Sequence, residues 1–225
     1  MEIEETKQEW SGKRLELIET AGQLFADFGV NGVSIRDIAE KCGVNVAAVN
    51  YYFGSKENLC METLRYVAWQ VRCPLTKKIL EDHTIDYNSK DVCREIIKGL
   101  VEERVQNYLS DKYPMWYSKL FLRSLVEPPL RFENVVFQNF IPELNALVEV
   151  LSRCAPRNSR EKCMFWAFSI LGEISFYVFA EPGIKIALNL TEKYPPAFLQ
   201  QLQEHIISLI LKGLELKEEK NLYES

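Results

Sequence analysis

Apolar side chains recur along most of this chain with the period of an α-helix. Steps of three and four residues separate the apolar positions most clearly in the segments 18–28, 60–71, 167–178 and 199–213. Such spacing places the apolar groups on one face of a helix. Sustained alternation of apolar and polar residues, the pattern of a half-buried strand, does not occur. The sequence therefore predicts an all-α fold.

Start and stop signals divide this pattern into nine or ten helices. Ser34 with Asp37 three residues later predicts a capping box. Gly29 and Gly43 each follow a helical pattern, where a left-handed residue ends a helix. Pro142 predicts a break or kink. The expected helices span residues 10–28, 35–42, 46–52, 56–80, 90–110, 114–126, 130–153, 159–180 and 195–218.

Composition excludes several classes of protein. The 225 residues include 47% apolar and 26% charged side chains, as in ordinary globular proteins. The net charge of −5 gives no hint of a nucleic-acid partner. The most apolar segment, 165–180, is shorter than the ~20 residues of a bilayer span and contains Glu173, and the acidic N-terminus does not resemble a secretory signal. We therefore expect a cytoplasmic protein with no membrane partner.

Cysteine and histidine offer little chemistry in this sequence. The six cysteines are scattered without a C-x-x-C pair, and His83 and His205 lie far apart. We expect the cysteines to be small buried side chains, with a redox sensor as the alternative. Because neither a metal site nor a catalytic constellation is recognisable, we predict no metal, no cofactor and no enzyme activity. An all-α enzyme, the alternative, would need convergent acid and base groups.

Residues 33–56 have the features of a helix-turn-helix. Ser34 caps a helix whose apolar face includes Ala39, which is small enough for a second helix to approach. Gly43 supplies the turn, and Asn45 caps the second helix. Two helices joined in this way can place the second helix in the major groove of DNA. A helical hairpin within the core is the other interpretation of the same pattern.

The side chains around the second helix suit a DNA surface. Small residues let a helix enter the groove, Asn can pair with adenine, and Ala or Val can contact a thymine methyl group. Hydroxyl and cationic groups suit phosphates. Residues 1–60 hold six basic and ten acidic side chains, so one copy would bind weakly at physiological salt and a dimer would double the contacts. The expected DNA-binding residues are Ser34, Arg36, Asn45, Val46, Ala47, Ala48, Asn50, Tyr51, Tyr52 and Lys56.

The first sixty residues resemble the DNA-binding domain of the TetR family of bacterial transcription regulators. The resemblance is carried by residues 18–21, 24–29, 34–39, 43–45 and 52–59.

The sequence also departs from the family pattern. Asn45 stands where the family usually has Ser or Thr, and Cys42 stands where Ala is usual. Asn50 stands where the family most often has a Tyr that contacts a phosphate, which opens a base-reading role for Asn50. Residues 48–54 and 121–128 resemble the CecR-like branch, in which Glu is usual at the position of Ser124.

The resemblance implies a homodimeric, ligand-responsive regulator, most often a repressor. Residues 1–56 would form the DNA-binding domain, and residues 57–225 would bind an effector and form the dimer. The partners would be double-stranded operator DNA, a second copy of the chain and a small hydrophobic or amphipathic effector. A tilt of the helix 56–80 would change the spacing of the two DNA-binding units on a pseudo-palindromic operator. A helical small-molecule-binding protein without specific DNA binding is the alternative.

Two further sets of residues complete the expected sites. The helix 159–180 is apolar nearly all round and needs cover on every side; a partner subunit would supply it, and a core helix of a monomer is the alternative. Aromatic walls with a few polar groups are typical of ligand pockets. The expected dimer interface comprises Phe165, Phe168, Phe176, Phe179, Leu202, Ile206, Leu209 and Ile210, and the expected effector site comprises Trp69, Arg72, Trp116, Leu120, Arg123, Phe137, Trp166 and Glu173.

Overall fold

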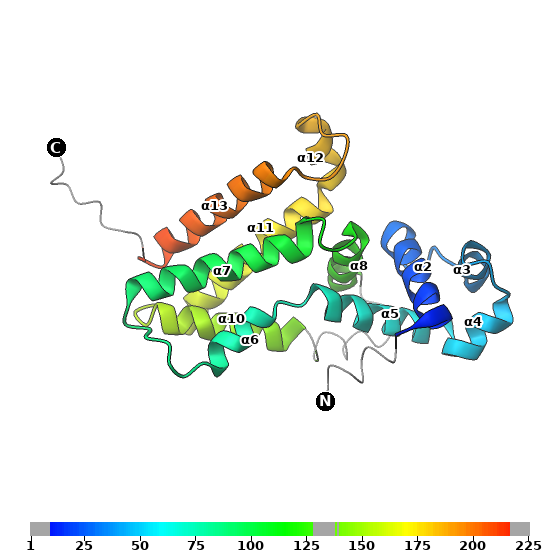
Figure 1. Cartoon of the computed structure of the whole chain (residues 1–225), viewed down its shortest axis with the longest axis horizontal. Helices are drawn as coiled ribbons and strands as arrows, with labels where there is room; N and C mark the ends of the chain where they lie inside the picture. The colour runs from blue at the N-terminus through cyan, green and yellow to red at the C-terminus, as the bar shows by residue number, and fades with distance from the viewer. Residues whose placement is uncertain (1–9, 128–137, 139, 217–225) are drawn as a thin grey trace. The chain divides into compact units, whose positions relative to one another are not determined.

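The computed structural model describes residues 10–127, 138 and 140–216 (Figure 1). The described residues form eleven helices and their connections, without a strand, which confirms the all-α fold and slightly exceeds the expected number of helices. The chain divides into two compact units, and the first combines residues 1–72 with 113–140. The domain boundary expected after residue 56 stays a prediction.

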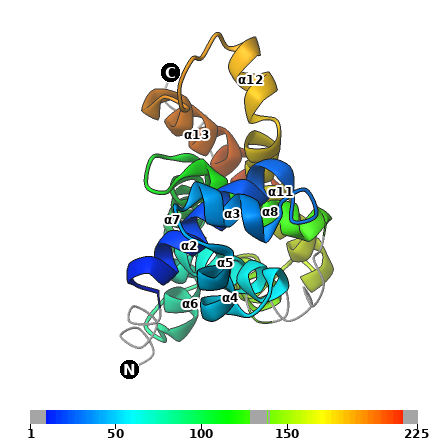
Figure 2. The same ribbon diagram turned by 90° about the vertical axis from the view of Figure 1, so that its right-hand side faces the viewer.

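The first unit contains five helices within the described residues. They are α2 (Gly12–Phe28), α3 (Ile35–Lys41), α4 (Val46–Phe53), α5 (Lys56–Val71) and α8 (Met115–Val126). The longer helices α2, α5 and α8 pack against one another. The short helix α3 packs on α2, and α4 packs on α3 and α5 (Figure 2). The two short helices are therefore fixed on a three-helix support.

Polar contacts reinforce the packing of α2. Glu19 accepts hydrogen bonds from the hydroxyl groups of Tyr66 on α5 and Tyr117 on α8, at 2.6 and 2.5 Å. Burial raises the pKa of Tyr66 to about 12, so this phenol keeps its proton and donates at physiological pH. Arg14 on α2 also forms an ion pair with Glu62 on α5, through two hydrogen bonds of 2.7 and 2.6 Å. These contacts join α2 to both supporting helices.

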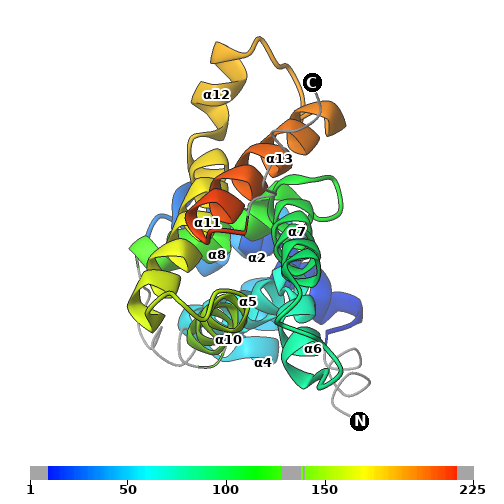
Figure 3. The same ribbon diagram turned by 90° about the vertical axis from the view of Figure 1, so that its left-hand side faces the viewer.

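The second unit contains six helices within the described residues. Helix α7 contacts four of the others, and α11 packs between α7, α10 and α13 (Figure 3). The helices are α6 (Pro74–Glu81), α7 (Lys90–Leu109), α10 (Ile141–Cys154), α11 (Arg160–Phe179), α12 (Glu181–Ala187) and α13 (Pro196–Gly213).

A buried arginine joins three helices of the second unit. Arg104 on α7 is 1% exposed and donates to the carbonyl of Leu100 and the hydroxyl of Thr76, both at 3.0 Å. Its guanidinium also lies 3.4 Å from Glu143 on α10. Burial raises the pKa of the Glu143 carboxyl, and the charge of Arg104 opposes that rise. Removing Glu143 alone would leave the buried guanidinium of Arg104 without its counter-charge.

The structure corrects several expected helix boundaries. The helix expected over residues 56–80 is two helices, because α5 ends at Val71 and α6 begins at Pro74, a residue that suits a first turn. Helix α12 was not expected; Pro182 lies in its first turn. Of the helix expected over 130–153, residues 130–137 and 139 lie outside the described residues, and α10 begins at Ile141.

Among the described residues, α11 alone is long and apolar enough to cross a membrane by length and composition. One face of this helix is buried against its neighbours. The buried side chains are Cys163, Ala167, Ile170, Ile174 and Val178. The opposite face carries exposed phenylalanines.

Candidate nucleic-acid interface

Helix α3 begins with a reciprocal cap that fixes its first turn. The Ser34 hydroxyl oxygen accepts a hydrogen bond from the backbone N–H of Asp37 at 3.2 Å, and the Asp37 carboxylate accepts one from the backbone N–H of Ser34 at 2.8 Å. The Ser34 hydrogen bonds lower the pKa of the Asp37 carboxyl because they stabilise its charged form. Ile38 and Ala39 are the buried side chains of α3. The cap and this packing hold a seven-residue helix that would be marginal alone.

A tight turn joins α3 to α4, as expected. Gly43 has a φ of +69°, a conformation that glycine adopts without the cost of a Cβ. The backbone N–H of Val44 donates to the carbonyl of Ala39 at 2.9 Å. Asn45 then caps α4, because its side-chain oxygen accepts from the backbone N–H of Ala48 at 2.8 Å. Capping, turn and packing together form the helix-turn-helix.

Helix α4 has a buried face and an exposed face. Val49 and Phe53, one turn apart, are buried against the supporting helices. Tyr51 is 84% exposed, and Asn50 also lies at the surface. At the N-terminal end, Val46 is 39% exposed. The exposed face therefore covers most of the helix, including its first turn, and is available to a groove.

The ten expected DNA-binding residues all lie in the first unit, at the start of α3, along α4 and at the start of α5. Three of them are half-buried: Ala48, Tyr52 and Lys56. The other seven are exposed: Ser34, Arg36, Asn45, Val46, Ala47, Asn50 and Tyr51.

The structure gives Lys56 a contact inside the unit, and its expected contact with DNA stays a prediction. Its ammonium group donates to the carbonyl oxygens of Val30 and Val33, both at 3.0 Å. These carbonyls belong to the loop between α2 and α3, residues 29–34. A lysine has three N–H donors, so two of them are used inside the unit. Lys56 first holds this loop, and only the remaining donor is left for a phosphate.

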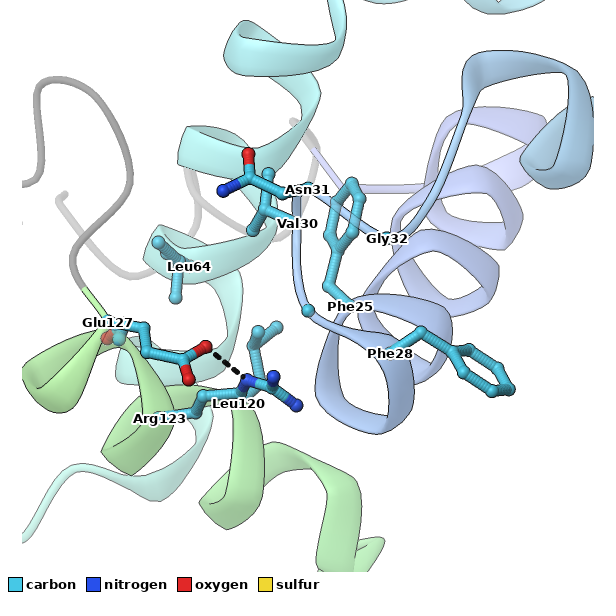
Figure 4. A pocket seen from close by; sticks show the side chains of 11 residues that line it. Phe25, Phe28, Val30, Asn31, Gly32, Leu64, Leu120, Arg123 and Glu127 are labelled. Atoms are coloured by element: carbon cyan, nitrogen blue, oxygen red, sulfur yellow. Dashed lines mark hydrogen bonds and ion pairs between the residues drawn. The ribbon is translucent and has the colours of Figure 1, made fainter.

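A second cation, on α8, holds the end of α2 next to this loop. Arg123 donates to the carbonyl of Ala26 at 3.3 Å. It also donates to Glu127 at 3.0 Å (Figure 4). A Cβ added at Gly29 would lie 2.9 Å from the guanidinium, so the chain passes close to Arg123. A hollow of about 240 Å³ opens beside this contact, and Leu120 lies on its wall. Lys56 on α5 thus holds the loop that enters α3, and Arg123 on α8 holds the end of α2 that precedes this loop.

The expected effector residues do not form one cluster within either unit. Trp69, Arg72, Trp116, Leu120 and Arg123 belong to the first unit, Trp166 and Glu173 belong to the second, and Phe137 lies outside the described residues.

Two of these residues have a clear packing role. A Cβ added at Gly22 would lie 2.2 Å from the ring of Trp116, and one at Gly213 would lie 1.9 Å from the ring of Trp166. Each tryptophan therefore covers a glycine of a neighbouring helix. Glu173 lies 3.9 Å from His205 on α13.

The expected dimer residues separate into two groups. Phe165, Phe168, Phe176 and Phe179 are 46–60% exposed, and Leu209 is 37% exposed. In contrast, Leu202, Ile206 and Ile210 are buried within the second unit. We therefore correct these three to core positions, since side chains already covered inside the chain add nothing to an outer face.

No group of His, Cys, Asp and Glu side chains suited to a metal ion occurs within residues 10–127 and 140–216.

A capped helix-turn-helix with an exposed second helix, followed by a helical second unit, defines a helix-turn-helix regulator. Comparison with known families agrees with this class. Residues 17–63 match the model of the bacterial regulatory proteins of the tetR family, and residues 93–214 match the C-terminal domain of the HTH-type transcriptional dual regulator CecR. The chain belongs to the TetR family, which confirms both expected resemblances.

Relatives of known sequence and structure extend this assignment. The dual regulator CecR of Shigella flexneri is 24% identical over 88% of this chain and 91% of its own length. The repressor KstR2 of Rhodococcus jostii strain RHA1 is 40% identical over 55 residues, 24% of this chain and 27% of its own. These relatives are transcriptional regulators, so the chain is a regulator and not an enzyme.

Solved structures share the fold. KstR2 of Mycobacterium tuberculosis has a TM-score of 0.63 at 18% identity, over 90% of this chain and 95% of that one. AibR, solved in complex with isovaleryl coenzyme A and operator DNA, has a TM-score of 0.61 at 16% identity, over 88% and 97%.

Proposed function

We propose that this protein is a cytoplasmic, ligand-responsive repressor that binds a pseudo-palindromic operator as a homodimer. A small hydrophobic or amphipathic effector releases it from DNA. In this proposal residues 1–56 carry the DNA-binding domain, and residues 57–225 carry the effector-binding and dimerisation functions.

The exposed face of α4 carries the DNA-binding part of the proposal. Its first turn presents Val46 and Ala47, which are small enough for the major groove and can contact thymine methyl groups. One turn later Asn50 offers an amide that can pair with adenine. Arg36 on α3 is exposed and suits a phosphate beside the groove. In this proposal Val46, Ala47 and Asn50 contact the bases. The surrounding polar groups contact phosphates and fix the position of the protein on the DNA.

The low positive charge of the DNA-binding segment favours a dimer. Residues 33–56 hold three basic and two acidic side chains, and Lys56 already donates to two carbonyls. Few phosphates can be neutralised by one copy, so affinity at physiological salt requires two copies on one operator. The exposed phenylalanines of α11 provide an apolar surface for that pairing.

Helices α5 and α8 offer a route from an effector to the DNA. Lys56 on α5 holds the loop that enters α3, and Arg123 on α8 holds the end of α2 before that loop. An effector that binds better when either helix is displaced would shift the position of α3 and α4. AibR, which shares the fold, was solved in complex with isovaleryl coenzyme A and operator DNA, so a protein of this fold can hold both a small molecule and DNA.

Selection of bound fragments from random-sequence duplex DNA, at near-physiological salt, tests the proposal. We expect an inverted repeat whose half-sites lie one helical turn, about 34–36 Å, or a multiple of it apart. DNA without a shared sequence would favour the alternative, a helical ligand-binding protein without specific DNA binding.

The recovered operator then allows a screen for effectors. Hydrophobic and amphipathic compounds are tested for release of the labelled operator from the protein. A compound that binds tightly yet leaves operator affinity unchanged would contradict the proposed coupling.

A further inference from the structure

The exposed stripe of α11 is symmetric about a glycine. Phe168 and Phe176 lie four residues before and after Gly172, and Phe165 and Phe179 lie seven residues before and after it. At 3.6 residues per turn, all four rings fall within about 40° of Gly172 around the helix axis. The four phenylalanines are 46–60% exposed, and Gly172 is exposed at the centre. The stripe thus has the same order of large and small side chains in both chain directions.

The small residues around the centre extend the same symmetry. Ser169 and Ser175 lie three residues on either side of Gly172. Their hydroxyl groups donate to backbone carbonyls of α11, at 3.0 Å for Phe165 and 2.6 Å for Leu171. These hydroxyl groups therefore need no hydrogen-bond acceptor from a second chain. A Cβ added at Gly172 would meet no atom within 4 Å in the described structure, so packing inside the chain does not explain the glycine.

We propose that α11 crosses α11 of a second copy at Gly172, in an antiparallel pair with the two-fold axis at this residue. This inference rests on the homodimer of the proposed function and adds its axis and register. In an isologous interface each contact occurs twice. The axis places Phe168 beside the partner's Phe176, and Phe165 near the partner's Phe179. Gly172 faces its own copy, where the missing side chain lets the two backbones approach.

The symmetry of the stripe favours the antiparallel pair over a parallel one. In a parallel pair every residue faces its own copy, whatever the sequence. In an antiparallel pair a large side chain meets a large one, and a small one meets a small one, only if the order is the same from both ends. The pairs of the exposed stripe, which lie three, four and seven residues from Gly172, meet this condition between Phe165 and Phe179.

The area of the stripe suits a second copy. With about 200 Å² for each ring, the exposed parts of the four phenylalanines amount to roughly 400 Å² per chain. Two copies would remove about twice that area, roughly 800 Å², from water, and neighbouring exposed residues must supply the rest of the ~1,200–2,000 Å² of a standard interface. Leu209 on α13, which packs beside α11, is also exposed and extends the face.

Cysteine cross-linking tests the position of the axis. Five of the six native cysteines are buried, and Cys42 is half-buried, so the variants are made in a Cys42→Ser background. We expect Gly172→Cys to form a disulfide-linked dimer in most chains after mild oxidation. Gly183→Cys on α12, where an added Cβ also meets no atom within 4 Å, is the matched control and should stay unlinked.

A second pair of variants tests the register. Phe168→Cys and Phe176→Cys are expressed together with tags of different size, and each is also expressed alone. The antiparallel pair predicts a mixed disulfide in the co-expressed sample and none in either single variant. Disulfides in the single variants and none in the mixture would establish a parallel pair and overturn the proposal.

A bulky side chain at the crossing tests the same contact without oxidation. Gly172→Leu should raise the dimer dissociation constant at least tenfold in sedimentation equilibrium, whereas Gly183→Leu should leave it unchanged. Leucine favours a helix more than glycine does, and space is available, so Gly172→Leu should fold. A wild-type dimer that neither cross-links at position 172 nor weakens in Gly172→Leu would overturn the axis but keep the dimer. A wild-type monomer would remove the dimer itself.

Discussion

Asn50 and Arg36 are both exposed near the same groove-facing surface, but their chemistry differs. The amide of Asn50 carries one donor group and one acceptor and can distinguish adenine from other bases. The guanidinium of Arg36 carries only donors, and at the start of α3, the first helix of the motif, we expect it to contact a phosphate beside the groove. We therefore expect Asn50 to read the sequence and Arg36 to contact the DNA backbone.

Substitution of each residue should separate these two roles. Asn50→Ala should change the preferred base at one position of each half-site, at a cost of about 1–3 kcal/mol for the original operator. Arg36→Ala should weaken all sequences alike and reduce the slope of log affinity against log salt by about 1. Binding to a library of operator variants at several salt concentrations measures both. An unchanged base preference in Asn50→Ala would reject its base-reading role.

Lys56 is expected to stabilise the fold as well as the DNA complex. Lys56→Met keeps the apolar stem but removes two hydrogen bonds to the carbonyls of Val30 and Val33. We expect the free energy of unfolding to fall by about 1–2 kcal/mol, measured by urea denaturation. Lys41→Met, at the exposed end of α3, is the control and should change stability little. Equal stability of the two variants would return Lys56 to a phosphate-binding role alone.

The buried cysteines should be unreactive in the native protein. Burial raises the pKa of the Cys60 thiol to about 12, so almost none of it is the nucleophilic thiolate at pH 8. We expect iodoacetamide at pH 8 to label Cys42 alone, and all six cysteines after unfolding. Mass spectrometry of tryptic peptides identifies the labelled positions. Rapid native labelling of Cys60 would contradict its burial.

At the scale of single residues, the sequence predicted which residues cap helices better than it predicted which groups a long side chain contacts. The caps by Ser34 and Asn45 were predictable because a cap needs only local spacing. The contact of Lys56 with Val30 was not, because it joins residues 26 positions apart. Nothing in the spacing of a lone lysine distinguishes a phosphate from a backbone carbonyl.

At the scale of an element, α3 depends on its cap for a defined start. The Asp37 carboxylate accepts a hydrogen bond from the Ser34 backbone N–H. The carboxyl group is a strong acceptor only when it is ionised. Its folded-state pKa lies below the unfolded value of about 3.9. The stabilisation is therefore fully present above pH ~4 and is lost as the pH falls through the folded-state pKa.

The pH dependence of Asp37→Asn should reveal this contribution. The variant should be less stable than the wild type at pH 7, and the difference should shrink towards pH 3. Urea midpoints at both pH values measure it. Glu40→Gln removes a carboxylate from the same helix without touching the cap, so its difference from the wild type should not follow this pattern. A constant difference for Asp37→Asn would assign the effect to packing.

The predicted helix boundaries agree with the structure where a local sequence signal marks the end of a helix. The helix expected over residues 90–110 is α7, Lys90–Leu109. The break after Val71 was missed because apolar spacing continues across it, and because Pro74 is acceptable in a first turn as well as at a break. The spacing of apolar residues identifies the buried face of a helix, but it does not identify the residue at which the helix ends.

At the scale of the whole molecule, the apolar side chains of α11 and α13 lie on two kinds of face: one is buried inside the second unit and the other is exposed. Leu202, Ile206 and Ile210 cover the inside of the second unit, whereas Leu209, one position from Ile210, is exposed. The sequence marks both sets as apolar and cannot tell the core of one chain from the face between two chains. Only the packing against α7 and α11 decides which side is inside.

Loss of the dimer should reduce operator affinity without changing the DNA-binding unit. Phe176→Glu places a charge at the proposed α11 crossing, where burial without a counter-charge is costly. Two linked half-site contacts act at an effective concentration that can raise avidity by 10²–10⁴ over one contact. We therefore expect the variant to bind the full operator about 100-fold more weakly and a single half-site with unchanged affinity, measured by fluorescence anisotropy.

The matched control is Ile186→Glu, on α12, where the side chain is 79% exposed and lies outside the phenylalanine stripe. It adds the same charge to an exposed apolar position of the same unit, so it should keep both the dimer and the full-operator affinity. If Phe176→Glu remained dimeric with full affinity, the interface would lie elsewhere on the chain. If it became monomeric and still bound the full operator tightly, one helix-turn-helix would suffice, and the low positive charge of residues 33–56 would no longer require a second copy.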